Sequence, residues 1–283
     1  MRIGFIGLGT MGYRIAKNIS SKYKVNVWNR TLKVSEDHSI KYNTILYKCI
    51  KDLSINSDII LTCLPTSNEV NEVSKKIENN TMNNKYLIDC TSGNPIDTKR
   101  IGEFLKKKNI RMLDSPISGG PEKAEMGNLS SIIGGDINDY NYIKPILDSF
   151  SEPVYVGNLG SGHAVKAINN ILNVSQLCLA SEALDALSNN NVNIEKALEA
   201  ISKSSGRSLM ITERIPKDVI NKKFNYGFKL GLMQKDVKIA LEMIDNKIMF
   251  SNIEELMEEA VNKYGYDSDY TNISRLYNIF TTK

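Results

Sequence analysis

The segment 7–12 has glycines at the spacing of a phosphate-binding turn. It reads Gly-Leu-Gly-Thr-Met-Gly, a G-x-G-x-x-G string that follows an apolar run of strand length and opens a helical pattern. Gly7 permits the tight turn, Gly9 lets the backbone approach a pyrophosphate, and Gly12 lets the helix lie close to the strand. The alternative is a glycine-rich turn without a ligand. We predict a dinucleotide site, at the positive end of the helix dipole. Its predicted cofactor contacts are Gly7, Leu8, Gly9, Thr10, Met11 and Gly12.

The end of the second strand pattern, at 24–28, distinguishes between the two nicotinamide cofactors. An NAD site usually carries Asp or Glu about 20 residues after the glycines, where it binds the ribose 2′-hydroxyl. Here the strand runs into Asn29, Arg30 and Thr31, and no carboxylate stands there. An arginine can pair bidentately with a phosphate, and the two neutral side chains add hydrogen-bonding groups. We therefore expect NADP rather than NAD, with these three residues as cofactor contacts; the alternative is that Arg30 is a solvated turn residue.

Lys166 and Asn170 lie within an unusually apolar helical pattern at 164–187. A charged residue on such a helix needs a reason, because burying an unpaired charge is costly. An ammonium can donate a proton to a developing alkoxide, and apolar surroundings would lower its pKa toward the working range. Residues four apart share one helix face, so Asn170 could bind a substrate or orient the lysine. This predicts a catalytic pair; the alternative is a lysine that reaches water from the edge of the helix.

Two kinds of domain must position these groups. Up to about residue 160, short apolar runs alternate with helical segments, which predicts a parallel sheet with helices on both faces. The predicted strands are 2–6, 24–28, 58–63, 86–89, 111–114 and 153–156. The later apolar periods are helical, at 164–187, 194–202, 233–244, 253–263 and 273–280. We expect an α/β, doubly wound parallel-sheet domain over 1–161 and an all-α domain over 162–283. The helix at 164–187 is apolar around its circumference and must be buried by neighbours, a second subunit among them.

Composition excludes several functional classes. The chain has 283 residues, 41% hydrophobic and 24% charged, and a net charge of +4. This is typical of a globular protein, and no basic run interleaved with aromatics predicts nucleic-acid binding. No apolar stretch reaches the roughly 18 residues of a membrane span, and the N-terminus does not resemble a targeting segment. Four cysteines without a C-x-x-C spacing and only two histidines predict reduced thiols, no metal site and a cytoplasmic location.

Three further segments make a family recognisable. Residues 114–127 read Asp-Ser-Pro-Ile-Ser-Gly-Gly-Pro-Glu-Lys-Ala-Glu-Met-Gly and resemble the substrate signature of the β-hydroxyacid dehydrogenases. Residues 160–170 resemble their catalytic-lysine helix, and 232–236 resemble a segment that closes over the cofactor. The resemblance covers essentially the whole chain. It implies a Rossmann-type domain, a helical C-terminal domain and an oligomer, a homodimer or homotetramer, built on the helical part.

The resemblance also implies an activity and further site residues. The family, which includes 3-hydroxyisobutyrate dehydrogenase and tartronate, glyoxylate and succinic semialdehyde reductases, moves a hydride between a nicotinamide and a small hydroxy acid or its aldehyde or keto acid. Lys166 would be the general acid–base. The implied substrate contacts are Ser118, Gly119 and Gly120. The further implied cofactor contacts are Leu64, Pro65, Thr91, Ser92 and Lys235. The family more often has Ser then Thr where this chain has Thr91 and Ser92, which leaves that contact open.

Two other functions stay open. An imine reductase is similar in sequence pattern, but those relatives generally carry a different residue at the lysine position. A non-catalytic NADP-binding scaffold could keep the fold, since fold alone does not establish activity. Arg207 and Lys229 could each bind a second acidic group of a substrate or simply face water. His163 lies at a variable position of the lysine motif and is interpreted as structural or solvated, and Asp269 receives no role.

Overall fold

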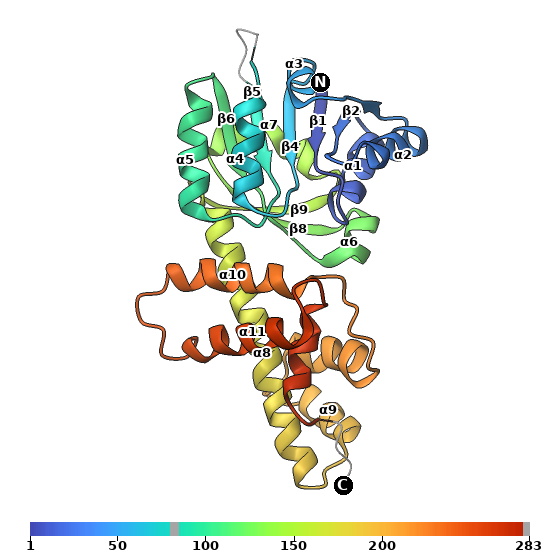
Figure 1. Cartoon of the computed structure of the whole chain (residues 1–283), viewed down its shortest axis with the longest axis vertical. Coiled ribbons are helices and arrows are strands. Elements are labelled where there is room, and N and C mark those ends of the chain that lie inside the picture. Colours follow the sequence, from blue (N-terminus) through green and yellow to red (C-terminus); the bar gives the residue numbers. More distant parts are fainter. Residues whose placement is uncertain (80–84, 280–283) are drawn as a thin grey trace. The chain divides into compact units, whose positions relative to one another are not determined.

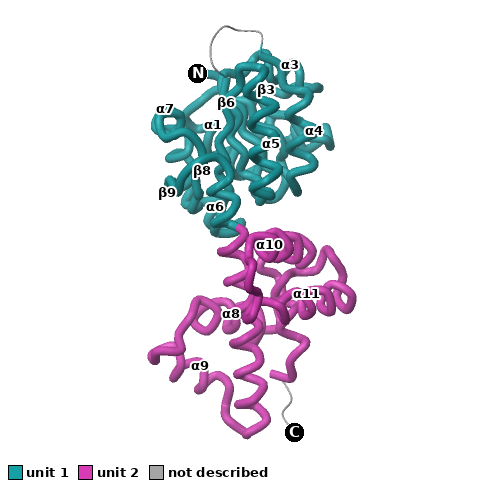
Figure 2. Tube along the Cα trace, turned by 90° about the vertical axis from the view of Figure 1, so that its left-hand side faces the viewer, with its two compact units in different colours: residues 1–166 teal, residues 167–283 magenta. Residues whose placement is uncertain are grey.

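The computed structural model describes residues 1–79 and 85–279 (Figure 1). The chain divides into two compact units, residues 1–166 and residues 167–283 (Figure 2). Within the described residues, no helix combines the length and apolarity needed to cross a membrane.

Unit 1 is built on a mixed β-sheet. Among the described residues, nine strands form it, in the order β3-β2-β1-β4-β5-β6-β8-β7, with β9 on β8. The strands are β1 (Arg2–Ile6), β2 (Lys24–Trp28), β3 (Ile45–Leu46), β4 (Ile59–Thr62), β5 (Lys85–Asp89), β6 (Ile110–Asp114), β7 (Ile117–Ser118), β8 (Leu129–Gly134) and β9 (Ser151–Gly157). The first six run parallel, as expected. In contrast, β8 is antiparallel to both β6 and β7, which the alternation of strands and helices did not predict.

Helices cover both faces of this sheet (Figure 1). They are α1 (Gly12–Ser20), α2 (Leu32–Tyr42), α3 (Ile50–Ile55), α4 (Ser67–Lys76), α5 (Pro95–Lys106), α6 (Gly120–Met126) and α7 (Ile137–Leu147). Successive strand residues enter opposite cores because side chains alternate across a strand. Ile59 and Leu61 of β4 pack in one apolar cluster with α1 and α7, and Ile60 packs in the other with α3, α4 and α5. The parallel strands are therefore rich in apolar residues, as is typical of sheets buried on both faces, although β2 contains the buried Asn26 and β6 the exposed Arg111.

Unit 2 is helical. The 29-residue helix α8 (Ser161–Asn189) begins in unit 1, and its buried residues form part of the hydrophobic core of unit 2. Around it lie α9 (Ile194–Ser202), a π-helix η1 (Met210–Ile220), α10 (Leu230–Glu242), α11 (Ser251–Tyr264) and a 3₁₀-helix η2 (Tyr270–Leu276). In the described part of this unit the β-structure is limited to one bridge between Lys229 and Asp269. The expected helices at 194–202, 233–244 and 253–263 coincide closely with α9, α10 and α11.

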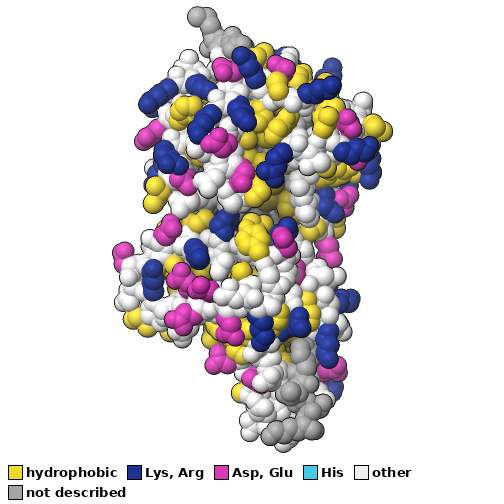
Figure 3. Space-filling view, in the orientation of Figure 1, with side chains coloured by type: hydrophobic (Ala, Val, Ile, Leu, Met, Phe, Trp, Pro, Cys, Tyr) yellow, Lys and Arg dark blue, Asp and Glu magenta, His cyan; other side chains and the backbone are white. Residues whose placement is uncertain are grey.

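Charges of both signs are interspersed over the surface face drawn in Figure 3. On this face, therefore, local groups rather than one broad positive field would attract an anionic ligand.

Candidate active site

The glycine turn between β1 and α1 has the geometry that the sequence motif requires. Gly7 has φ 99°, and a side chain there would overlap the Cys63 carbonyl, while one at Gly12 would overlap the carbonyl of Gly7. The packing of the protein itself thus explains two of the three glycines. A side chain at Gly9 would meet no protein atom within 4 Å. Since nothing in the chain demands glycine there, the open space fits a group that approaches the backbone from outside, as a pyrophosphate does.

Asn29 supports this turn from the end of β2. Its Oδ1 accepts the Leu8 N–H at 3.0 Å, and its Nδ2 donates to the Thr31 carbonyl at 3.1 Å. The neighbouring Arg30 and Thr31 side chains are exposed. The amide of Asn29 therefore supports the glycine turn, whereas Arg30 and Thr31 are open to solvent beside it.

Thr91 joins the loops that follow β4 and β5. Its hydroxyl accepts the Leu64 N–H at 3.1 Å, and its own N–H donates to Asp89 Oδ1 at 3.1 Å. Thr91 is buried, whereas Ser92 is half-buried and Pro65 is exposed. The carboxyl edge of the parallel strands, where open α/β sheets bind ligands, thus brings the glycine turn and these two loops together.

Ser118 ends β7 and is followed by two glycines with positive φ, 135° at Gly119 and 73° at Gly120. A side chain at Gly119 would also lie 2.9 Å from Lys123 Cδ. Only glycine adopts such backbone angles readily, so the segment turns sharply at these two positions. All three residues are half-buried. A ligand can therefore meet a hydroxyl and backbone N–H groups at the same turn.

Asn170 is buried on α8 and is joined to α10 through one carboxylate. Its Nδ2 donates to Asp236 Oδ2 at 2.6 Å, and its Oδ1 accepts from Asn169 Nδ2 at 3.1 Å. Asp236 Oδ1 lies 3.0 Å from Lys235 Nζ, and Asp236 is 2% exposed. Lys166, four residues before Asn170 on the same helix, is buried as well, at 8% exposed. The sequence motif at 232–236 includes Asp236 but does not by itself indicate a site role for it; the signal that could have done so is a carboxylate on the apolar face of a helix.

Three other candidate residues face solvent or make contacts of their own. Arg207 is exposed, and Lys229 pairs with Asp267 at 2.7 Å on the surface. Asp269 has a structural role: its carboxylate accepts the N–H groups of Gly227, Phe228 and Thr271. It thereby fixes the segment before α10 to the start of η2.

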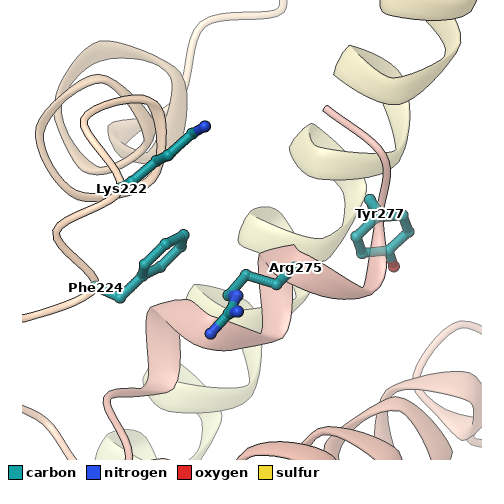
Figure 4. Close-up of a pocket in the computed structure, with 4 residues that line it drawn as sticks. All are labelled: Lys222, Phe224, Arg275 and Tyr277. Atoms are coloured by element: carbon teal, nitrogen blue, oxygen red, sulfur yellow. The ribbon is translucent and has the colours of Figure 1, made fainter. Parts of the chain in front are cut away.

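Unit 2 also has a hollow of about 500 Å³ lined by Lys222, Phe224, Arg275 and Tyr277 (Figure 4). The Arg275 guanidinium lies 5.4 Å from the centre of the Phe224 ring and donates to Asn272 Oδ1. No residue predicted from sequence to bind cofactor or substrate lines this hollow. We therefore treat it as separate from the candidate site.

Comparison with known proteins covers both units. Residues 2–157 match the family model described as the NAD binding domain of 6-phosphogluconate dehydrogenase. Residues 160–277 match the model described as NAD-binding of NADP-dependent 3-hydroxyisobutyrate dehydrogenase. Together the two matches span most of the chain, one for each part of the fold.

Individual relatives agree with these models. The chain is 33% identical to the uncharacterized oxidoreductase YkwC of Bacillus subtilis over 246 residues, which is 85% of this chain and 84% of that protein. It is 31% identical to 2-(hydroxymethyl)glutarate dehydrogenase of Eubacterium barkeri, over 86% of this chain and 82% of that one. In structure it is similar to Mycobacterium tuberculosis 3-hydroxyisobutyrate dehydrogenase with L-serine, with a TM-score of 0.89, 20% identity and coverage of 97% and 98%.

Proposed function

Because the chain belongs to the β-hydroxyacid dehydrogenase family, we propose that it moves a hydride between NADP and a small β-hydroxy acid or the matching semialdehyde or keto acid. The coarser statement, a nicotinamide-dependent oxidoreductase acting on a CH–OH group, follows from the family and its relatives. The observation that carries the finer proposal is the polar set on helices α8 and α10 that consists of the buried Asn170 and Asp236 and the half-buried Lys235. Buried charges are costly, and function is a common reason to keep them.

Lys166 is the proposed general acid–base. In the reductive direction its ammonium donates a proton to the carbonyl oxygen as negative charge develops there, and in the oxidative direction the neutral amine takes the hydroxyl proton. The bound nicotinamide supplies or accepts the hydride. The buried position of Lys166 on α8 supports this role, since desolvation and a protected site favour proton transfer within the pocket over exchange with water.

Asn170 serves as a fixed acceptor beside the lysine. A carboxylate only accepts hydrogen bonds, so the bond to Asp236 determines which end of the amide is Nδ2. The amide oxygen is then the atom left to accept from groups other than Asp236, and Asn169 already donates to it. An oxygen has two lone pairs, so a substrate hydroxyl or the Lys166 ammonium can donate to the second. Asp236 also balances the charge of Lys235, which we propose lies near the nicotinamide ribose.

The carboxylate of the substrate is proposed to bind at Ser118, Gly119 and Gly120. The half-buried Ser118, which carries a hydroxyl, and the sharp turn at the two glycines support this assignment. NADP is favoured over NAD because an exposed Arg30, rather than a carboxylate, follows β2. The reductive direction is the proposed physiological one, since NADP often serves reduction.

The proposed assembly is a homo-oligomer of cytoplasmic protomers. Leu172 and Leu179 on α8 are 44% and 60% exposed and lie seven residues apart, so they share one face of the helix. Two exposed leucines on one face of a helix support contact with a second copy through the helical unit. The four cysteines are free thiols, which supports a reducing compartment.

The deciding experiment measures turnover of short β-hydroxy acids with NADP and NAD, reduction of the matching aldehydes and keto acids, and reduction of a cyclic imine. We expect turnover of a hydroxy acid or its carbonyl partner with NADP preferred, and a loss of about 10²- to 10⁴-fold in kcat for Lys166→Ala. Lys238→Ala, an exposed lysine on α10, is the matched control and should keep full activity. Imine reduction alone, or binding of NADP without any turnover, would contradict the proposal.

A further inference from the structure

A buried carboxylate from the sheet caps the helix that carries Lys166. Asp114, the last residue of β6, is 0% exposed. Its Oδ1 accepts the Gly160 N–H at 2.7 Å, and its Oδ2 accepts the His163 N–H at 2.7 Å. The Gly160 carbonyl accepts the Ala164 N–H at 3.0 Å, so Gly160 stands at the N-cap position of α8 and has no side chain to cap it. Asp114 therefore satisfies, from a distant strand, the N–H groups of both the N-cap and the third helical residue, which a helix leaves unpaired at its start.

Glycines next to the Asp114 carboxylate leave room for a side chain of this size. A side chain at Gly162 would lie 2.8 Å from Asp114 Oδ2, and one at Gly134 would overlap Oδ1. Gly160 has φ 93°, which other residues adopt only with strain. Gly134 on β8 and Gly162 on α8 thus border the carboxylate. A longer carboxylate, or a side chain at either glycine, would force the first turn of α8 away from β6.

The side chain of His163 also fixes the first turn of α8. The ring is 0% exposed, its Nδ1 lies 2.7 Å from Thr98 Oγ1 on α5, and its Nε2 lies 3.9 Å from Asp89 Oδ2 at the end of β5. A side chain at Gly93 would come within 2.9 Å of the ring. His163 is therefore structural rather than solvated, and it packs against the loop that holds Thr91 and Ser92.

We infer that Asp114 is a positioning residue for the reaction: it fixes the first turn of α8 to the carboxyl edge of the sheet and so sets the place of Lys166. This inference rests on the proposed function. Lys166 follows the capped His163 by three residues, and Ser118 follows Asp114 by four, so one carboxylate connects the lysine helix with the substrate segment. Bonds from N–H groups to a carboxylate are stronger than neutral ones, and the negative charge also suits the N-terminal end of the helix dipole.

Asp114→Asn tests this with almost no change in volume. An asparagine keeps one acceptor but turns an NH₂ group toward a backbone N–H, so one bond is lost and two donors face each other. A displacement of the lysine by an ångström can cost about 10²-fold in rate, so we expect kcat to fall by at least about ten-fold. The cofactor Kd should change less than kcat, because the glycine turn lies between β1 and α1, whereas Asp114 contacts the loop of Thr91 and Ser92 through His163. Asp58→Asn is the matched control, since Asp58 also accepts a backbone N–H, from Arg2, but far along the chain from α8.

Hydrogen exchange gives a readout that does not depend on activity. In the wild-type protein the Gly160 and His163 amides should be protected, and in Asp114→Asn they should exchange on the order of ten-fold faster or more, while α10 amides keep their rates. If the variant folds and its kcat per cofactor-binding site equals that of wild type, the inference is overturned. If the variant does not fold, rapid exchange of the two amides in wild type would overturn it and slow exchange would support it. If wild type turns over no hydroxy acid, the proposed function fails, and the same exchange rates still decide whether Asp114 is the cap.

Discussion

The Asn170 amide and the Asp236 carboxylate meet at 2.6 Å although 66 residues separate them in the chain. The carboxylate also holds Lys235 at 3.0 Å, so a single acidic group aligns an amide on one helix and an ammonium on another.

Asp236→Asn should therefore lower kcat/KM more than it lowers cofactor affinity. The substitution removes the charge that pairs with Lys235 and lets the Asn170 amide adopt either orientation. Loss of a hydrogen bond to a charged group costs about 1.5–3 kcal/mol, so we expect a decrease of roughly ten- to hundred-fold. Steady-state kinetics of the variant are compared with those of Asp245→Asn, an exposed aspartate beyond the end of α10. Equal kinetics in the two variants would show that Asp236 has no part in the reaction.

Substitution of the glycines in the turn should separate folding from cofactor binding. The methyl group added by Gly9→Ala would meet no protein atom within 4 Å. The midpoint of thermal unfolding of this variant should therefore match that of wild type, while its Kd for NADP rises. Gly12→Ala places a methyl group against the Gly7 carbonyl and should lower the unfolding midpoint before any ligand is added. Calorimetric titration and thermal unfolding of both variants check this. Unchanged NADP affinity in Gly9→Ala would argue against a pyrophosphate at the turn.

Arg30→Ala should reduce the preference for NADP. We expect kcat/KM for NADP to fall by about ten-fold or more, while that for NAD changes little, because only NADP carries the 2′-phosphate that a guanidinium binds bidentately. Arg100→Ala, an exposed arginine on α5 that pairs with Asp97, is the control. A parallel fall with both cofactors would instead indicate damage to the turn.

His38 should make unit 1 less stable in acid. Burial lowers the pKa of His38 from its usual 6.5, and its ring nitrogens face Thr44 Oγ1 and the Tyr13 carbonyl. The folded state thus favours the neutral ring. Above pH 6.5 both states are neutral and the contribution to stability is complete. As the pH falls from 6.5 toward the lower folded value, the unfolded chain binds the proton first and that stability is lost.

Urea unfolding at about pH 5 and pH 7.5, on either side of the usual histidine pKa, measures this effect. The decrease in the free energy of unfolding between the two should be smaller in His38→Gln than in wild type. An equal decrease in both proteins would assign the acid sensitivity to other groups.

Charged residues on the exposed face of α8 should break the proposed oligomer. Leu172→Glu with Leu179→Glu places like charges on a surface that now carries apolar side chains, and sedimentation should then report a smaller species than wild type. The control is Ile248→Glu, an exposed apolar residue outside any helix. If wild type sediments as a monomer, the assembly prediction is wrong.

Much of the fold could be predicted from the local pattern of apolar residues in the sequence. The strands β1, β2, β4, β5 and β6 lie where short runs rich in apolar residues predicted them, because strands buried on both faces carry few polar side chains. Local pattern did not predict β3 and β7, which have two residues each, or β8, which begins Leu-Ser-Ser and lacks a continuous apolar run. Nor did it predict an element at 210–220, where the structure has a π-helix with Pro216 inside it.

Only those parts of the site that lie within one short sequence motif could be predicted from the sequence. The glycine turn and the lysine helix could be recognised because each lies within about a dozen residues. The bond between Asn170 and Asp236 and the cap of Asp114 on His163 join residues 66 and 49 positions apart. No period in the sequence encodes such pairs, so the roles of Asp236, Asp114 and Asp269 required the structure.

The pocket around the Asp114 carboxylate also limits how this sequence can diverge. A side chain at 134 would need the space of Oδ1 and one at 162 the space of Oδ2, and each would also meet a backbone carbonyl, that of Asn158 or of Ile132. Replacement of the acid by a smaller neutral residue would therefore not make room for a methyl group at either glycine. Positions 134 and 162 are expected to stay glycine in descendants whatever residue stands at 114, whereas an acid at 114 can persist only where both stay glycine.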